Sequence, residues 1–426
     1  MHPLSHYIDQ DLAPPEERVA PSPAEFMMAL AFVNMIGFAG WNALINNFAR
    51  EQAGFGWFET GLTQTFREIP GLLAFTAVFW LMWLREQTVG YASLVLLALG
   101  VGLTGLYPSL GGILVTTVIM SFGFHYFETI NYSLQLQLLR GADAPMAMGR
   151  IQSAASAAQF VAYGLVFVLS GWLGVASYPA LFGLFAVVAL GLTALSIRRF
   201  PRYDSAVPQG KHIVLRRRYG LYYALTFMSG ARRQIFSAFG AFLLVDRFGL
   251  SVSGLALLFL VTALVSTLLA SRLGQLVGRL GERRTMLLEN LLLIGVFSGY
   301  ALTGSATVAV VLFILDGASM TLMIAQRTYF QKIGDPSDMA ATTSVAFTFN
   351  HIAAVVIPVT FGLLGRRDPS LIFWLGTAIA TSSLALAALV PQAPAPGREM
   401  LLPGFFQRGP PRGKPLQPDT LAQPAE

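Results

Sequence analysis

Apolar residues in this chain gather in long blocks separated by short polar segments. Each block holds roughly 18 to 27 residues, the length with which a helix crosses about 30 Å of hydrocarbon. The blocks fall at about 24–46, 59–83, 89–108, 111–138, 146–173, 177–197, 219–245, 251–273, 284–303, 306–329, 340–364 and 369–390. This pattern predicts an all-α membrane protein with twelve transmembrane helices.

Basic residues predict how these helices are oriented. The N-terminus, alternate loops and the C-terminal tail carry 21 of the 28 Lys and Arg residues, whereas the opposite loops carry four. Since Lys and Arg concentrate on the cytoplasmic side of membrane proteins, we expect both termini in the cytoplasm. Residues 1–23 lack the basic and apolar regions of a signal peptide, so we expect them to form a cytoplasmic segment.

The chain divides at a basic loop in its middle. Residues 200–218 contain two prolines and several Arg residues, and are predicted to be a cytoplasmic linker between six-helix bundles at 24–199 and 219–391. Weak repeats support two homologous halves, because Met35-Ile-Gly37 matches Met228-Ser-Gly230 at an offset of 193 residues. Residues 392–426 are rich in Pro, Gly and Gln, which predicts a disordered cytoplasmic tail.

Composition agrees with a membrane protein and excludes several kinds of site. The chain is 54% hydrophobic and 12% charged, too apolar for a soluble domain of 426 residues. It has no cysteine, which excludes disulfides and thiolate metal sites. No His/Glu spacing indicates a closed metal site, and no glycine loop for phosphate or catalytic triad is present. We therefore expect neither an enzyme nor a cofactor, and the net charge of +6 does not indicate nucleic acid.

The segment between the eighth and ninth blocks carries a family motif. It reads Gly274-Gln-Leu-Val-Gly278-Arg279-Leu-Gly281-Glu282-Arg283-Arg284 and resembles the Gly-x-x-x-Asp-Arg-x-Gly-Arg-Arg signature of the major facilitator superfamily. The matching positions are Gly274, Arg279, Gly281 and Arg283, while Gly278 replaces the family's acidic residue. The first-half copy is reduced to Leu84-Arg85-Glu86-Gln87. The resemblance implies two six-helix bundles, alternating access and a central cavity lined by helices one, four, seven and ten.

Polar residues inside the predicted helices agree with that cavity, because the third, sixth and twelfth helices have no charge in their middles. The candidates are Asn34, Trp41, Asn42, Arg67, Glu68, His125, Glu128, Asn131, Gln135, Gln152, Gln159, Arg232, Arg233, Gln234, Asp316, Gln326, Asn350 and His351. At 100° per residue, the polar residues of the fourth helix form one stripe. The stripe is predicted to face the cavity, with interhelical hydrogen bonding as the alternative.

Arg232 and Arg233 are the most costly pair in the sequence, because an arginine at bilayer depth costs about 2.5 to 3.5 kcal/mol on insertion scales. As neighbours they leave a helix 100° apart. We expect one to bind an anionic substrate and the other to pair with Glu68, Glu128 or Asp316. An internal ion-pair network that includes Arg67 is the alternative. Next to Arg67 and Glu68, Pro70 is predicted to kink the second helix.

Two carboxylates are candidates for proton coupling. Glu128 and Asp316 lie at matching depths in the fourth and tenth helices, where a carboxylate is either paired or takes up a proton. Substrate contacts are predicted for Arg232, Arg233, His125, Asn34, Trp41 and Asn350. Packing is the alternative for Trp41, and His351 is expected to be a buried, hydrogen-bonded histidine.

Together these features predict a monomeric secondary transporter of the bacterial inner membrane. We expect it to move a small organic anion or polar metabolite together with protons. One alternative is a drug or amphiphile exporter, although the family's Gly-Pro antiporter motif is missing from the fifth helix. Another is a membrane assembly factor that does not transport.

Overall fold

The computed structural model describes residues 21–81, 83–139, 144–172, 177–203, 215–335 and 339–402, and in these residues every regular element is a helix. The first half of the chain forms α2 (Pro23–Ala53), α3 (Trp57–Leu72), η1 (Ala74–Thr76), α4 (Ala77–Trp80), α5 (Glu86–Thr104), α6 (Leu110–Leu138), α7 (Ala144–Phe167), η2 (Val168–Trp172) and α8 (Tyr178–Arg199). The second half forms η3 (Arg217–Tyr219), α9 (Gly220–Gln234), η4 (Ile235–Gly240), α10 (Ala241–Asp246), α11 (Val252–Leu302), α12 (Ala306–Ser319), η5 (Met320–Met323), α13 (Ile324–Ile333), α14 (Met339–Gly365) and α15 (Ser370–Ala388).

Serine residues mark the beginnings of several of these helices. Ser22 precedes Pro23 and forms a capping box, in which the Glu25 amide donates to Ser22 Oγ at 3.2 Å and the Ser22 amide donates to Glu25 Oε2 at 2.8 Å. This exchange satisfies two amides that have no partner inside the helix. A single side-chain cap of the same kind begins α6, α8, α11 and α12, at Ser109, Ser177, Ser251 and Ser305.

The helices agree with the twelve predicted crossings. Ten helical stretches in the described residues are long and apolar enough to span a membrane. The two further crossings are interrupted helices, α3–η1–α4 and α9–η4–α10. In the first, α3 ends two residues after Pro70, as the proline kink predicts. In the second, a π-helix begins directly after Gln234, so that a wider turn follows the two arginines.

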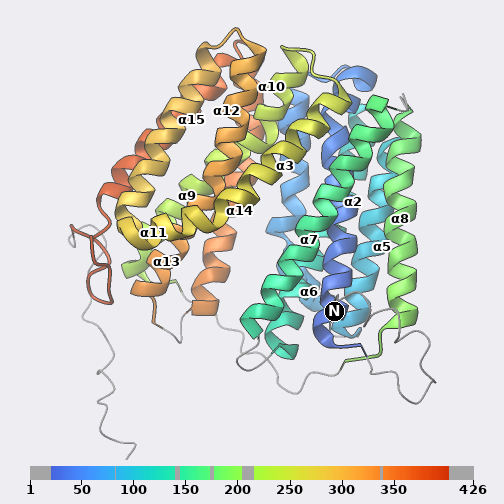
Figure 1. Cartoon of the computed structure of the whole chain (residues 1–426), viewed down its shortest axis with the longest axis horizontal. Helices are drawn as coiled ribbons and strands as arrows, with labels where there is room; N and C mark the ends of the chain where they lie inside the picture. Colours follow the sequence, from blue (N-terminus) through green and yellow to red (C-terminus); the bar gives the residue numbers. More distant parts are fainter. Residues whose placement is uncertain are drawn as a thin grey trace, which may run out of the picture.

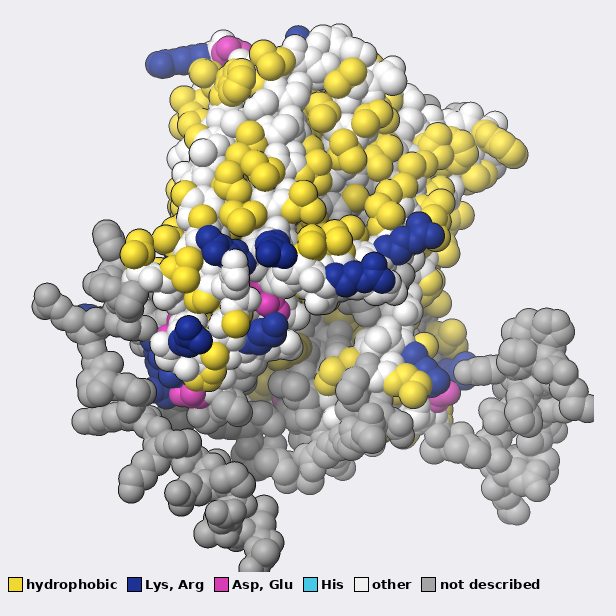
Figure 2. Space-filling model, turned by 60° about the vertical axis from the view of Figure 1, so that its left-hand side comes forward, with side chains coloured by type: hydrophobic (Ala, Val, Ile, Leu, Met, Phe, Trp, Pro, Cys, Tyr) yellow, Lys and Arg dark blue, Asp and Glu magenta, His cyan; other side chains and the backbone are white. Residues whose placement is uncertain are grey.

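The helices form two bundles, which lie side by side in Figure 1. We call the end where α2 begins and α15 ends the terminus side, and the opposite end the far side. The bundles approach each other at the far side and diverge toward the terminus side (Figure 1). On a face that includes the C-terminal bundle, apolar side chains cover a broad band, and Lys and Arg gather below it on the terminus side (Figure 2).

Small residues hold the two bundles together where α3 packs against α14. A Cβ at Gly61 would lie 2.2 Å from the Pro358 carbonyl oxygen, so only glycine allows this approach. Farther along α3, Thr65 Oγ1 donates to the Val355 carbonyl at 2.8 Å. On the far side, Asp246 accepts from Trp57 Nε1 at 3.1 Å and pairs with Arg50 at 2.6 Å. These contacts join the bundles at the far side and at mid-height.

Two expectations about chain breaks need correction. The expected loop at 274–283 is helical as far as Leu280, and only Gly281 leaves the helix, with φ 79° and ψ 167°. Residues 392–402 of the tail are ordered, because Tyr329 Oη donates to the Glu399 carbonyl at 2.6 Å and the Glu399 side chain is buried. The bulk of the segments predicted at 1–23 and 200–218, and the tail after residue 402, lies outside the described residues.

Candidate functional site

Three titratable side chains from both bundles meet where α3, α6 and α14 cross. Glu68 lies on α3, His125 on α6 and His351 on α14, and all three are buried. His351 Nε2 lies 3.7 Å from Glu68 Oε2, and the imidazole rings of His125 and His351 meet edge to face with centroids 5.4 Å apart. Gly71 makes room for both rings, because a Cβ there would lie 2.4 Å from His351 Cδ2. We call Glu68, His125 and His351 the central cluster.

Two guanidinium groups flank the central cluster. Arg67 Nη2 donates to Glu68 Oε1 at 2.6 Å, and its guanidinium carbon lies 6.0 Å from the centre of the Phe38 ring. Arg233 Nη2 donates to Asn350 Oδ1 at 2.8 Å, and Arg233 also interacts electrostatically with Glu68. One carboxylate therefore faces two guanidinium groups. With both imidazoles neutral, this region has a net charge of +1.

Arg232 points elsewhere, into the core of the C-terminal bundle. Its Nη2 donates to Glu289 Oε1 on α11, and both side chains are buried. The direct ion-pair partner of Arg232 is therefore Glu289 and not one of the three predicted carboxylates, although Arg232 also interacts electrostatically with Asp316. The 100° between neighbouring residues explains the divergence: Arg233 faces the other bundle while Arg232 faces α11.

Asp316 is fully buried in α12 and has no hydrogen-bond partner for either carboxylate oxygen among the described residues. Arg232 is the cation with which it interacts electrostatically. Tyr300 lies within electrostatic range, and its hydroxyl likewise finds no hydrogen-bond partner in the part of the chain that the structure describes. Counting Arg232, Glu289 and an ionised Asp316, the core of this bundle would carry a net charge of −1.

Glu128 occupies a different setting in the N-terminal bundle. Its side chain is exposed although it lies well inside α6, and its Oε1 accepts a hydrogen bond from Asn34 Nδ2 at 3.0 Å. Asn34 lies on α2 and is buried, so the bond joins the first and fourth crossings. Trp41, also on α2, is fully enclosed in the apolar core and stacks on Phe38. The structure thus places Trp41 in a packing position, which was the alternative to substrate contact.

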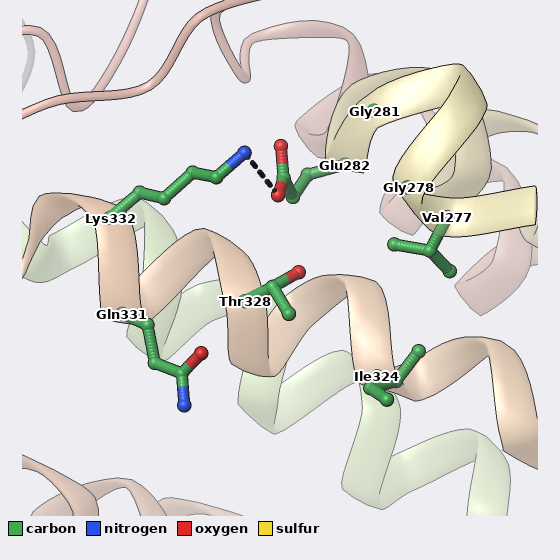
Figure 3. Close-up of a pocket in the computed structure, with 8 residues that line it drawn as sticks. All are labelled: Val277, Gly278, Gly281, Glu282, Ile324, Thr328, Gln331 and Lys332. Carbon is green, nitrogen blue, oxygen red and sulfur yellow. Dashed lines mark ion pairs between the residues drawn. The ribbon is translucent and has the colours of Figure 1, made fainter. Parts of the chain in front are cut away.

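Part of the motif segment, including Gly278, Gly281 and Glu282, borders a separate cavity on the terminus side. This cavity of about 290 Å³ lies between the Gly281 break in α11 and helix α13 (Figure 3). Buried Glu282 pairs there with Lys332 at 2.6 Å. The carboxylate at 282 is thus present four residues after Gly278, the position at which the family motif has its acidic residue. Gly281 supports the break through its positive φ, while Gly274, Arg279 and Arg283 lie along α11.

Two contacts of this site were not predicted from the sequence. Glu68 and His351 were among the polar candidates but were not predicted to meet each other, and Glu289, the partner of Arg232, was not a candidate. The histidines gave a clue to the contact between His351 and Glu68. Only two of the chain's five histidines, His125 and His351, lie in predicted crossings. For Glu289 the signal was Arg232 itself, since a buried arginine requires a counter-charge.

Comparison with known proteins identifies the fold. The family model described as Major Facilitator Superfamily matches residues 27–358. Among curated proteins, no match is found. A solved structure of the nucleoside transporter NupG superimposes with a TM-score of 0.69 at 15% identity, covering 86% of this chain and 98% of that chain.

Two other solved structures are similar. A bacterial homologue of the human lysosomal transporter Spinster, in an inward-facing and occupied conformation, has a TM-score of 0.67 at 14% identity and covers 87% of this chain and 97% of its own. The peptide transporter POT in complex with sulfate has a TM-score of 0.67 at 13% identity, covering 86% of this chain and 93% of that chain. At these identities the likeness concerns the fold alone. The family match extends over most of the chain, so this multi-pass membrane protein belongs to the major facilitator superfamily of transporters.

Proposed function

We propose that this chain is a secondary active transporter that carries a small organic anion together with protons by alternating access. It works as a monomer in a bacterial inner membrane, with both termini in the cytoplasm. The basic residues of the terminus side support this orientation. The substrate lies between the bundles, and neither nucleic acid nor a catalysed reaction is part of its function.

The uncompensated guanidinium at the bundle interface carries the proposal. Arg67 donates to one carboxylate oxygen of Glu68. The direct hydrogen-bond partner of Arg233 is the neutral side-chain amide of Asn350, and the buried Nε of Arg233 has no hydrogen-bond partner among the described residues. A buried charge without a counter-charge is costly, and an anion of the substrate would offset that cost. Guanidinium suits the role because its planar fork binds carboxylate through two hydrogen bonds.

We assign protons to Glu128 and Asp316, two carboxylates in the middle of crossings that form no ion pair with a described residue. Asp316 supports this assignment because an isolated ionised carboxylate in an apolar core is strongly disfavoured, so the protonated acid suits its surroundings. Glu128 supports it because it is exposed and accepts its hydrogen bond from the neutral amide of Asn34. We assign uptake and release of protons to Glu128 and storage in the closed core to Asp316.

A ligand screen on the purified protein tests the charge of the substrate. Unfolding temperatures are measured with pairs of compounds that differ only in charge, such as lactate with lactamide and succinate with succinamide. A ligand at 100 times its Kd stabilises the folded state by about 2.7 kcal/mol. The proposal expects stabilisation by a carboxylate and none by its amide. Stabilisation by neutral or cationic compounds alone would contradict it and favour a drug exporter.

Two variants of Arg233 test whether this residue contacts the bound anion. Arg233→Ala is expected to abolish uptake of the stabilising anion into proteoliposomes, because it removes the proposed anion contact. Arg233→Lys retains the charge without the planar fork and is expected to weaken binding instead of abolishing it. Size-exclusion profiles check that both variants fold. Normal uptake by Arg233→Ala would remove the anion site from this position.

A further inference from the structure

The central cluster has the composition and convergence of a metal site. The chain has five histidines and no cysteine. His125 and His351 come from different bundles, yet both meet Glu68 at the bundle interface. One potential ligand atom from each of the three residues lies within 4.8 Å of the other two. In the described residues, this is the one group of His, Asp and Glu side chains with such a separation.

We propose that Glu68, His125 and His351 bind a divalent transition metal ion such as Zn²⁺ or Co²⁺. Two imidazoles and one carboxylate are a familiar zinc ligand set, with metal–ligand distances of about 2.0 to 2.2 Å. Tetrahedral ligands at such distances lie roughly 3.4 Å from one another. The 3.7 Å between His351 Nε2 and Glu68 Oε2 is close to this value, so small side-chain movements complete the site.

Neighbouring groups orient Glu68 so that its second oxygen is turned toward His351. Arg67 occupies Oε1 of Glu68, while Oε2 faces His351 at a distance longer than a hydrogen bond. Because Gly71 has no Cβ, no side chain at this position of α3 occupies the space beside both rings. With Arg67 contacting the carboxylate from the other side, the orientation of Glu68 is held by a neighbour that would not itself bind the metal.

The net charge of the region indicates which ligand would occupy the fourth coordination position of the metal ion. Arg67, Arg233 and Glu68 sum to +1, and a divalent ion would raise the total to +3 in a buried region. A three-ligand site keeps one open position, so we infer that the metal binds together with an anion, such as chloride or hydroxide. Arg233 is close enough to interact with Glu68, which makes it the cation that this bound anion would meet.

Metal binding has a structural consequence, because the ligands belong to both bundles. Glu68 and His125 lie on α3 and α6, and His351 lies on α14. A bound ion would therefore link the bundles at mid-height, next to the contact between α3 and α14. It should raise the unfolding temperature and resist separation of the bundles.

The test uses the full chain in a background in which His2, His6 and His212 are replaced by alanine. This background has two histidines and no cysteine, so the titration probe, Co²⁺ chloride, has few other ligands. Calorimetry is expected to give one site per chain, and the visible spectrum should show absorption from Co²⁺ bound by imidazole. His125→Ala, His351→Ala and Glu68→Gln should each weaken binding at least about tenfold.

Thr129→Ala serves as the matched control, because it removes a polar side chain one helical turn from His125 that is not a proposed ligand; Thr129 Oγ1 donates to the His125 carbonyl at 2.9 Å. It is expected to retain Co²⁺ affinity within about twofold and to show the same spectrum. Unchanged affinity in His351→Ala and Glu68→Gln would overturn the proposal, as would an equal loss in Thr129→Ala. Because this test requires no transport, its outcome is independent of the anion substrate.

Discussion

Arg232 on α9 donates to the Glu289 carboxylate on α11, so the first of two adjacent arginines is neutralised inside one bundle. The second, Arg233, donates to Asn350 on α14 and interacts electrostatically with Glu68 of the other bundle. The two neighbouring arginines therefore have different roles, one in the stability of the bundle and one in ligand binding. Arg232 holds the C-terminal bundle together, and Arg233 is available to meet a ligand. The two residues should therefore respond differently to substitution.

Glu289→Leu is expected to destabilise the protein by about 3–5 kcal/mol, because it leaves Arg232 buried without a counter-charge. Unfolding by denaturant in detergent micelles measures this loss. The double variant Arg232→Met/Glu289→Leu should recover most of the stability, since apolar residues of similar volume can replace a buried ion pair. Additive losses in the double variant would contradict the coupling between the two side chains. Arg233→Ala should leave the unfolding midpoint almost unchanged.

The far-side contact between the bundles can be fixed by a disulfide. A Cβ at Gly171 would lie 3.1 Å from the Cβ of Ser253, near the 3.5–4.5 Å that disulfides span. Gly171→Cys with Ser253→Cys should therefore crosslink on mild oxidation and stop transport by preventing the far side from opening. Reduction should restore it. Since the chain has no native cysteine, each single variant is a direct control. Full transport by the crosslinked protein would show that the far side need not open.

Asp316→Asn is expected to fold and bind the anion but to lose accumulation driven by a pH gradient. The amide has the shape of the protonated acid and cannot release a proton. Exchange of labelled for unlabelled anion across proteoliposomes should continue, because exchange needs no net proton movement. Glu128→Gln is the comparison at the exposed carboxylate. Proton-driven accumulation at the wild-type level in both variants would exclude these carboxylates as carriers.

Gly281→Ala should destabilise the protein by about 1–3 kcal/mol, because its backbone (φ 79°, ψ 167°) lies in a region that residues with a Cβ rarely adopt. Gly278→Ala is the matched control. Gly278 is three residues away on the same helix, and an added Cβ there meets open space. We expect thermal unfolding to separate the two variants clearly. Equal unfolding temperatures would mean that the break tolerates a side chain.

Much of the fold could be predicted from hydrophobic length and turn chemistry. A block of about 20 apolar residues can satisfy its backbone in a membrane only as a helix or within a closed barrel, so the twelve crossings and the Pro70 kink follow from local sequence. The sequence predicted the break at Gly281 in the correct segment, but the predicted loop at 274–283 is longer than the break in the structure. Helical structure continues through Leu280, and a single glycine suffices for the turn.

Side-chain partners were the part that local sequence left open. Three carboxylates were predicted as ion-pair partners of the two arginines, but Arg232 pairs with another carboxylate, Glu289. His351 was weighed alone, although it meets Glu68 across the bundle interface. Helix tilt and rotation decide such pairings, and these depend on the packing of small residues such as Gly61 against a distant helix.

The sequence alone determined that this chain crosses a membrane twelve times, that it has two halves and that it carries the superfamily motif. These properties depend on apolar length and local motifs, which each segment carries by itself. Only the tertiary structure decided that Arg232 is neutralised within its own bundle and that Arg233 is not. It also brought His125, Glu68 and His351 together from helices far apart in the chain. Such contacts exist only once the helices have packed, because the register between helices fixes which side chains share a buried space.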